Sequence, residues 1–80
     1  MPTFYVIDGV KILLFFRDHN PPHFHAEIAE YKALIRISDG EMLEGELPKN
    51  KKKKISNWAK EHQEELMEIW QELQINTENE

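Results

Sequence analysis

Residues 18–25 read Asp18-His19-Asn20-Pro21-Pro22-His23-Phe24-His25, and this segment decides how the chain turns between two apolar stretches. Each proline fixes its own φ angle and biases the residue before it away from the helical region. The segment is therefore predicted to form a stiffened, extended corner. Three of the four histidines of the chain lie within seven residues around the double proline, so this corner is also the first place to look for chemistry.

Two strands are predicted before the corner. Thr3–Ile7 is rich in β-branched and aromatic residues, and Asp8-Gly9 is a strong two-residue hairpin signal because both turn positions need positive φ. Residues 10–17 form the second strand. Its apolar side chains lie on both faces, with Val10, Ile12 and Leu14 opposite Leu13 and Phe15. We therefore expect this strand to be central in the sheet, or covered at least in part on each face.

The strand predicted directly after the corner, residues 23–28, alternates in polarity. One face carries Phe24, Ala26 and Ile28, and the other carries His23, His25 and Glu27. If the first face meets the core, both histidines point to the outside of the sheet.

Two further strands are predicted before residue 48. A weaker turn at Ala29-Glu30 leads into residues 31–37, which also alternate. In that stretch Tyr31, Ala33, Ile35 and Ile37 lie opposite Lys32, Leu34 and Arg36. Asp39-Gly40 is a second hairpin signal, and residues 41–47 return as a short edge strand with Leu43 and Leu47 inward. Pro48 ends this strand because it has no N–H for a sheet ladder.

The remainder predicts one long C-terminal helix over about residues 49–74, followed by an acidic tail at 76–80. Its apolar stripe recurs at spacings of three and four residues and consists of Ile55, Trp58, Ala59, His62, Leu66, Ile69, Trp70 and Leu73. Such a helix is about 39 Å long, whereas the strands span only ~17–23 Å. We therefore expect the helix to overhang the sheet, bend around it or meet a partner. The predicted fold is one α+β domain (1–80), an antiparallel meander of four to five strands packed against this helix.

Composition and charge restrict the function. The chain has 80 residues, a net charge of −5 and no cysteine, so disulfides and thiolate chemistry are excluded. We expect neither a signal peptide nor a membrane partner, because the start lacks the pattern of a leader and no apolar run is long enough to span a bilayer. A cytoplasmic location fits these features. Five of the ten basic residues fall within six positions, at Lys49, Lys51, Lys52, Lys53 and Lys54.

Three interpretations of the histidines stay open. His23 and His25, two apart on a strand, have the spacing of a metal-ligand pair for a divalent ion such as zinc, and His19, Asp18 or Glu27 would complete the site. Alternatively, His19, His23, His25 and Asp18 are candidate acid–base catalysts for metal-independent RNA cleavage. In the third interpretation the imidazoles only stabilise the corner by hydrogen bonds and stacking. His62 is separate, because it lies on the apolar stripe and is expected at the core or its boundary.

The lysine run opposes the dipole of the helix that it begins, so its role needs an explanation. One hypothesis is an anion or nucleic-acid site formed by these lysines together with Arg17 and Arg36. The alternatives are an acidic protein partner and a solvated first turn. Trp70 and Leu73 are predicted to contribute either to the core or, where the helix overruns the sheet, to a partner interface.

Several motifs together resemble a small bacterial family known as domain of unknown function 4160. They are Met1-Pro2-Thr3, Asp8-Gly9, Phe16 with the histidine corner, Gly45-Glu46-Leu47-Pro48, and a helix with Trp58, Ala59, His62, Glu65-Leu66 and Trp70. The lysine run is more basic than the family pattern at that place. The resemblance implies a bacterial, cytoplasmic, stand-alone domain encoded beside another short protein, an arrangement similar to toxin–antitoxin pairs. It implies no active-site residues.

The sequence thus favours a small interaction module that works with a protein partner or as a homodimer. We expect it to be one component of a toxin–antitoxin-like pair acting on RNA or DNA. The alternatives are a histidine-dependent, metal-independent ribonuclease and a metal-binding module at the histidines. No cofactor other than that divalent metal is predicted.

Overall fold

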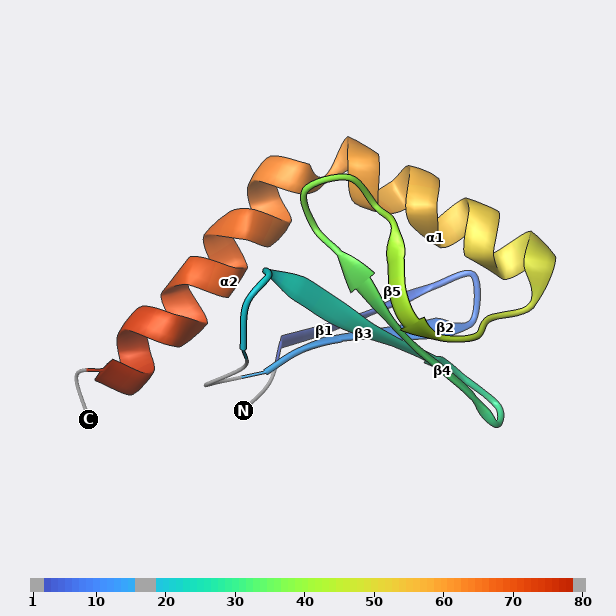
Figure 1. The fold of residues 1–80 in the computed structure, drawn as a ribbon, viewed down its shortest axis with the longest axis horizontal. Helices are drawn as coiled ribbons and strands as arrows, with labels where there is room; N and C mark the ends of the chain where they lie inside the picture. Colours follow the sequence, from blue (N-terminus) through green and yellow to red (C-terminus); the bar gives the residue numbers. More distant parts are fainter. Residues whose placement is uncertain (1–2, 16–18, 79–80) are drawn as a thin grey trace.

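The computed structural model describes residues 3–15 and 19–78, and the side chains of residues 5–15 and 19–74. The strands of this part are β1 (Thr3–Ile7), β2 (Val10–Leu14), β3 (His23–Ile28), β4 (Tyr31–Arg36) and β5 (Met42–Gly45). They form one sheet in the order β1-β2-β3-β4-β5 with every neighbouring pair antiparallel (Figure 1). The predicted α+β meander is therefore confirmed.

The two turns predicted by Asp-Gly pairs differ. Asp8 and Gly9 form the expected two-residue hairpin with φ of 51° and 82°. β4 and β5 also form an antiparallel hairpin around Asp39-Gly40, but its turn is longer than two residues, because β4 ends at residue 36 and β5 starts at residue 42. A wider loop joins them, closed by hydrogen bonds from the Arg36 N–H to the Glu41 carbonyl (2.8 Å) and from the Gly40 N–H to the Arg36 carbonyl (2.9 Å).

The C-terminal region contains two helices, not the single helix predicted for residues 49–74. They are α1 (Lys49–Glu61) and α2 (Gln63–Glu78), so residues 76–78 of the predicted tail are helical. His62 separates them with φ of −119° and ψ of 23°, and its ring Nδ1 lies 2.9 Å from the Trp58 carbonyl oxygen. The His62 N–H also donates to this carbonyl, at 3.1 Å, so the ring shares an acceptor of the helical ladder, and a side chain that enters the ladder is a recognised cause of a kink. No helix among the described residues is long and apolar enough to cross a bilayer.

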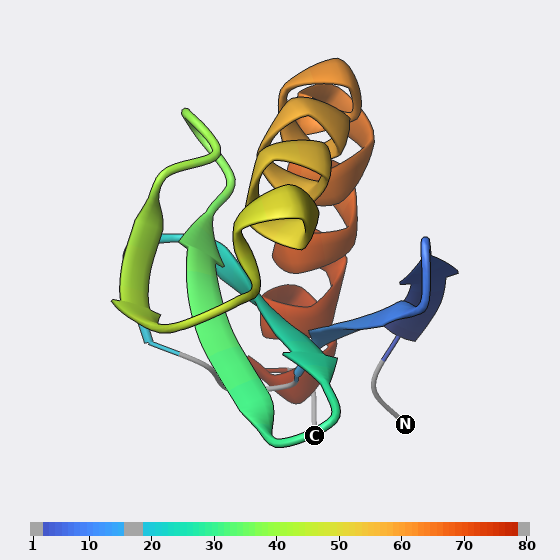
Figure 2. The ribbon, with the colours of Figure 1, turned by 90° about the vertical axis from the view of Figure 1, so that its right-hand side faces the viewer.

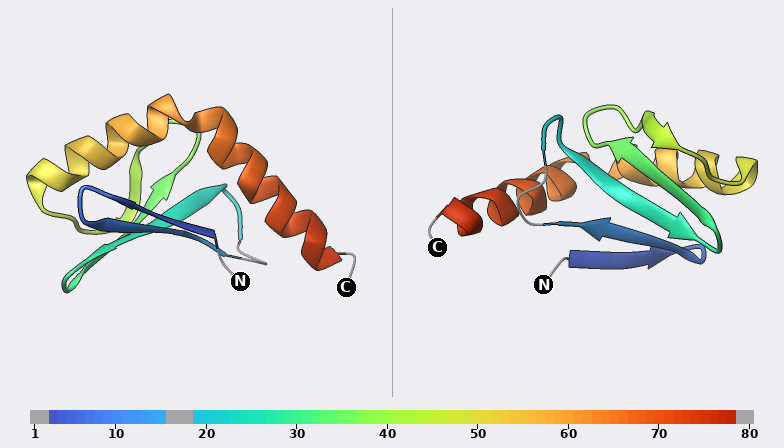
Figure 3. Two further views of the ribbon diagram at one scale, coloured as in Figure 1. Left: turned by 180° about the vertical axis from the view of Figure 1, so that it is seen from behind. Right: turned by 60° about the horizontal axis from the view of Figure 1, so that its bottom comes forward.

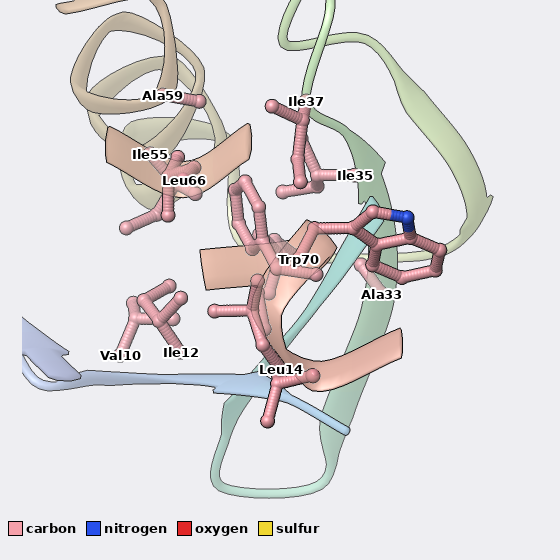
Figure 4. Packing of buried hydrophobic residues seen from close by; sticks show 14 residues of the cluster. Val10, Ile12, Leu14, Ala33, Ile35, Ile37, Ile55, Ala59, Leu66 and Trp70 are labelled. Carbon is pink, nitrogen blue, oxygen red and sulfur yellow. The ribbon is translucent and has the colours of Figure 1, made fainter. Parts of the chain in front are cut away.

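The bend lets both helices pack on one face of the sheet, as Figures 2 and 3 show. We call this side the inner face; it carries Val10, Ile12, Leu14, Phe24, Ala26, Ala33 and Ile35, all buried. Ile55 and Ala59 from α1 meet them together with Leu66 and Trp70 from α2 (Figure 4). A straight helix of this length would leave its far end beyond the sheet, whereas the bend gives both apolar stripes one core.

The two edges of the sheet differ. β5 has four residues, its pairing with β4 shifts in register between Leu34 and Ile35, and it ends at Gly45 with φ of 86°. Such irregularities discourage pairing with another strand. β1 has none of them. Its sequence is TFYVI without a charged residue, and Val6 is 61% exposed.

Candidate functional site

The histidine corner leads directly into β3. The Asn20–Pro21 peptide bond is cis, and His23 is the first residue of the strand. The His23 side chain is only 1% exposed, its Nδ1 lies 2.8 Å from the Pro21 carbonyl oxygen, and its ring centroid is 5.3 Å from that of Trp70. The expectation that His23 points away from the helix is therefore wrong. The reason is the bend at His62, which carries α2 past the end of the sheet where β3 begins (Figure 1).

The three imidazoles of the corner lie in one row with His23 in the middle. Ring centroids are 5.2 Å apart for His19 and His23, and 5.4 Å apart for His23 and His25. His19 is exposed, whereas His25 is half-buried and meets the Phe15 ring edge to face at 4.6 Å. Two of the three imidazoles thus pack against aromatic rings, His23 against Trp70 of α2 and His25 against Phe15, which follows β2.

This packing bears on the two chemical interpretations. A side chain that is 1% exposed cannot reach an RNA phosphate without rearrangement, so burial argues against His23 as a general acid or base. For the predicted metal ligands His19, His23 and His25, no group of three or more suitable side chains in the described ranges is arranged to hold an ion. Asp18 and Arg17 lie outside the described residues.

The lysine run has a structural role that the sequence did not indicate. Lys51 Nζ lies 2.9 Å from both the carbonyl and the carboxylate Oδ2 of Asp8, and Lys54 Nζ lies 3.2 Å from the same Oδ2. The hydrogen bonds from Lys51 and then Lys54 lower the pKa of the Asp8 carboxyl. Two of the five lysines therefore join the start of α1 to the β1–β2 turn. The others are exposed, and no described carboxylate forms a salt bridge with them; they are Lys49, Lys52 and Lys53.

Arg36 is occupied by an internal partner. Its Nε and its terminal nitrogen lie 3.0 and 2.6 Å from the two carboxylate oxygens of Asp39, a two-pronged geometry. The hydrogen bonds from Arg36, followed by one from the Glu41 N–H, lower the pKa of the Asp39 carboxyl to about 2. This pair closes the β4–β5 loop, so Arg36 is a poor candidate for the nucleic-acid contact predicted from sequence.

The outer face of the sheet, opposite the inner face, carries neither helix (Figure 3). Leu13, His25 and Leu34 are register partners across β2, β3 and β4, and all three are half-buried. The adjacent register row is charged and alternates in sign, with Glu27 between Lys11 and Lys32. A shallow hollow of about 280 Å³ lies beside Leu34 and His25. An apolar row flanked by paired charges is thus open to solvent in the middle of the sheet.

The sequence contained the signal for this face but we interpreted it differently. The signal is a set of apolar residues on the side of the strands that faces away from the inner-face core. They are Leu13 and Phe15 in and after β2, and Leu34 in β4. The sequence predicts β2 to be central in the sheet or covered in part on each face; β2 is an interior strand between β1 and β3, and both helices pack on its other side.

The sequence profile of the family described as "Domain of unknown function (DUF4160)" matches residues 9–71, most of the chain. The chain belongs to this family. No curated protein and no solved structure is significantly similar to it. Membership in DUF4160 brings no assigned function, so the function of this DUF4160 domain has to be argued from its surfaces.

The sequence leaves two roles open for Trp70 and Leu73, the core and a partner interface, and their burial supports the core. Trp70 and Leu73 are only 4% and 6% exposed, and both belong to the hydrophobic core. They are buried because the bend at His62 turns the apolar stripe of α2 onto the core at the end of the sheet where β3 begins (Figure 1). These two side chains therefore belong to the core and not to an exposed surface.

Proposed function

We propose that this domain is an interaction module that binds a second, different protein through the outer face of its sheet. The observation that carries the proposal is the row Leu13–His25–Leu34, which runs across three adjacent strands on the face without a helix. Apolar centres with a charged surround are typical of the core and rim of protein interfaces.

The chemistry of the face favours a protein over the other classes of ligand. Glu27 lies between Lys11 and Lys32, and Glu44 lies beside Leu34, so the face has no excess of positive charge to attract a polyanion. The hollow of about 280 Å³ is shallow and lies just below the size range of sites that enclose small molecules. A flat, mixed surface of this kind fits another folded surface or an amphipathic segment.

The wider role that we propose is one half of a toxin–antitoxin-like pair acting on RNA or DNA in the bacterial cytoplasm. The support for a nucleic-acid contact is the exposed set Lys49, Lys52 and Lys53 on α1, far from the outer face. We expect binding of single-stranded RNA at low salt to weaken steeply as salt rises. Replacing these three lysines with glutamine should reduce both the affinity and its salt dependence, while the outer-face partner still binds.

The test is co-purification and light scattering with the product of the adjacent gene, using variants matched in chemistry. Leu34→Lys places a charge in the apolar row, and the lysine stem preserves part of the local packing. Met67→Lys is the control, because Met67 is also half-buried but lies on α2, on the helical side of the domain. Circular dichroism and thermal unfolding verify that both variants are folded.

We expect the wild type and Met67→Lys to form a complex of defined stoichiometry and Leu34→Lys to lose it. Equal binding by all three proteins would remove the outer face from the interface. Failure of the wild type to bind the adjacent gene product would remove the proposed pair altogether.

A further inference from the structure

β1 presents a row of backbone groups that the sheet does not use. Ile7 and Val10 close the two-residue hairpin, so the residues of β1 that hydrogen-bond to β2 are Ile7, Tyr5 and Thr3. In an antiparallel pair the alternate residues turn their N–H and C=O groups the other way. The backbone groups of Phe4 and Val6 therefore point away from β2, at the end of the strand order.

The Val6 side chain, which lies on the outer face at the edge of the sheet as the register partner of Lys11, is apolar and exposed. Val6 is the large hydrophobic residue that is most open to solvent among the described side chains, at 61%. In proteins that stay monomeric, the edge strands usually carry a charge, a bulge or a proline. β5 has a register shift and a terminal glycine, whereas β1 has five uncharged residues in regular register. The contrast indicates that β1 is covered in the working protein.

The charges beside β1 are arranged with opposite signs at its two ends. Lys51 and Lys54 hold the basic start of α1 against Asp8, directly after β1. The Tyr5 hydroxyl donates to Glu65 of α2 at 3.2 Å, and α2 continues toward the first residues of β1 (Figure 3). α2 contains five glutamates and no lysine or arginine. The helices therefore run along β1 from a basic end to an acidic end.

We propose that a second copy of this chain pairs with β1 across a two-fold axis, joining two sheets into one of ten strands. The two β1 strands are then antiparallel, so the basic end of one copy lies beside the acidic end of the other. In this orientation the uncharged β1 strands meet each other, and the basic helix start at one end of β1 meets the acidic helix of the other copy. The edge is therefore complementary to itself. This contact uses the backbone edge of β1, whereas the partner proposed above binds around Leu13, His25 and Leu34; Val6 borders that face beside Lys11.

The outward backbone groups fix the register. With the axis at Tyr5, Phe4 of each copy pairs with Val6 of the other, and all outward groups of the strand are used. An axis at Phe4 would place Pro2, which has no N–H, opposite Val6. An axis at Val6 would place Asp8 of the turn opposite Phe4. The pairing of Phe4 with Val6 is therefore the register that we assign.

The first test measures mass and self-affinity by light scattering and sedimentation equilibrium over a concentration series. We expect the wild type to reach twice the 9.6 kDa of one chain. Val6→Lys should weaken self-association roughly tenfold or more, because it replaces two apolar cross-strand contacts with charges. Val6→Pro is the second variant; it removes an outward N–H without removing a β1–β2 bond. Glu44→Lys, on the β5 edge, is the control and should associate like the wild type.

The second test exchanges charge between the helices. One protein carries Asn50→Glu and Lys53→Glu on exposed positions beside Lys54, and the other carries Glu68→Lys and Glu72→Lys on the Glu65 side of α2. Each protein alone should self-associate more weakly than the wild type, because like charges now meet across the axis. Mixed together, they should restore association as a heterodimer.

Three results would overturn the proposal. The first is a single-chain mass for the wild type up to millimolar concentration. The second is a dimer that folded Val6→Lys and Val6→Pro variants leave unchanged. The third is a mixture of the two charge variants that associates no better than either protein alone. Loss of the outer-face complex in Leu34→Lys has no bearing on these outcomes, so the two proposals fail separately.

Discussion

Gly45 and Gly9 have the same backbone conformation but different surroundings. Alanine at each position therefore separates the cost of a positive φ from the cost of a steric clash. Their φ angles are +86° and +82°, both in the left-handed region that residues with a Cβ rarely adopt. A Cβ on Gly45 would lie 2.1 Å from the Lys32 carbonyl oxygen and 2.9 Å from Ala33 Cα. A Cβ on Gly9 would meet only the Ile28 side chain, at 3.8 Å. Gly9→Ala thus reports the conformational cost alone.

The expected magnitudes follow from these distances. Gly9→Ala should lower the free energy of unfolding by about 1 kcal/mol, since the left-handed region costs roughly 1–2 kcal/mol and alanine recovers ~0.4–1 kcal/mol of unfolded-state entropy. Gly45→Ala carries the same cost, and β5 must also move by about an ångström from β4. That movement breaks the hydrogen bond from the Glu46 N–H to the Lys32 carbonyl (3.0 Å) and disturbs the adjacent pairing, at ~0.5–1.5 kcal/mol per bond. The total is about 3 kcal/mol.

The assay is urea unfolding followed by the fluorescence of Trp58 and Trp70, which report on α1 and α2. On thermal unfolding the two variants should differ by roughly 8–16 °C, at ~4–8 °C per kcal/mol for a domain of this size. Equal destabilisation of Gly45→Ala and Gly9→Ala would refute the close approach of β4 to Gly45, and with it the register of the β5 edge.

Three further predictions concern the turn, the loop and the histidine corner. Ala29 has φ of 54°, so Ala29→Gly should raise the free energy of unfolding by about 0.5–1 kcal/mol in the same urea assay; a loss of stability would contradict the left-handed turn. The Asp39 carboxyl pKa is lowered to about 2 from 3.8, so its stabilising contribution is complete above pH 3.8 and disappears as the pH falls toward 2. Arg36→Met should lose less stability than the wild type across that pH window, measured by urea unfolding at stepped pH. Parallel curves of unfolding free energy against pH for variant and wild type would exclude the Arg36–Asp39 pair as the cause of the pH dependence. We expect RNA to remain intact with the wild type; cleavage that disappears in His23→Ala or His25→Ala would instead support a ribonuclease, and cleavage stopped by chelator alone would support a metal site.

The strands were predictable because their signals are local. β1 and β3 have the bounds that alternation and the Asp8-Gly9 turn predict, since a period of two and a positive-φ turn are properties of a few adjacent residues. The apolar stripe of the C-terminal region was equally local, and its members from Ile55 to Leu73 are buried or half-buried.

The errors arose where position depends on distant contacts. Neither proline nor glycine marks the break at His62, and its cause is a ring that hydrogen-bonds to the carbonyl of Trp58. That bend in turn buries His23 under Trp70, so one undetected kink misplaced both the histidine corner and the proposed interface. The pairing of Lys51 with Asp8 links residues 43 positions apart, which no local pattern encodes.

The irregular β5 edge has a consequence for the size of any assembly built on β1. If two copies join through their β1 strands, the outermost strands of the combined sheet are the two β5 strands, each short, shifted in register and ended by a glycine. Neither offers a regular row of backbone groups to a third copy. In such a dimer, growth would stop at two chains, without the risk of forming fibres.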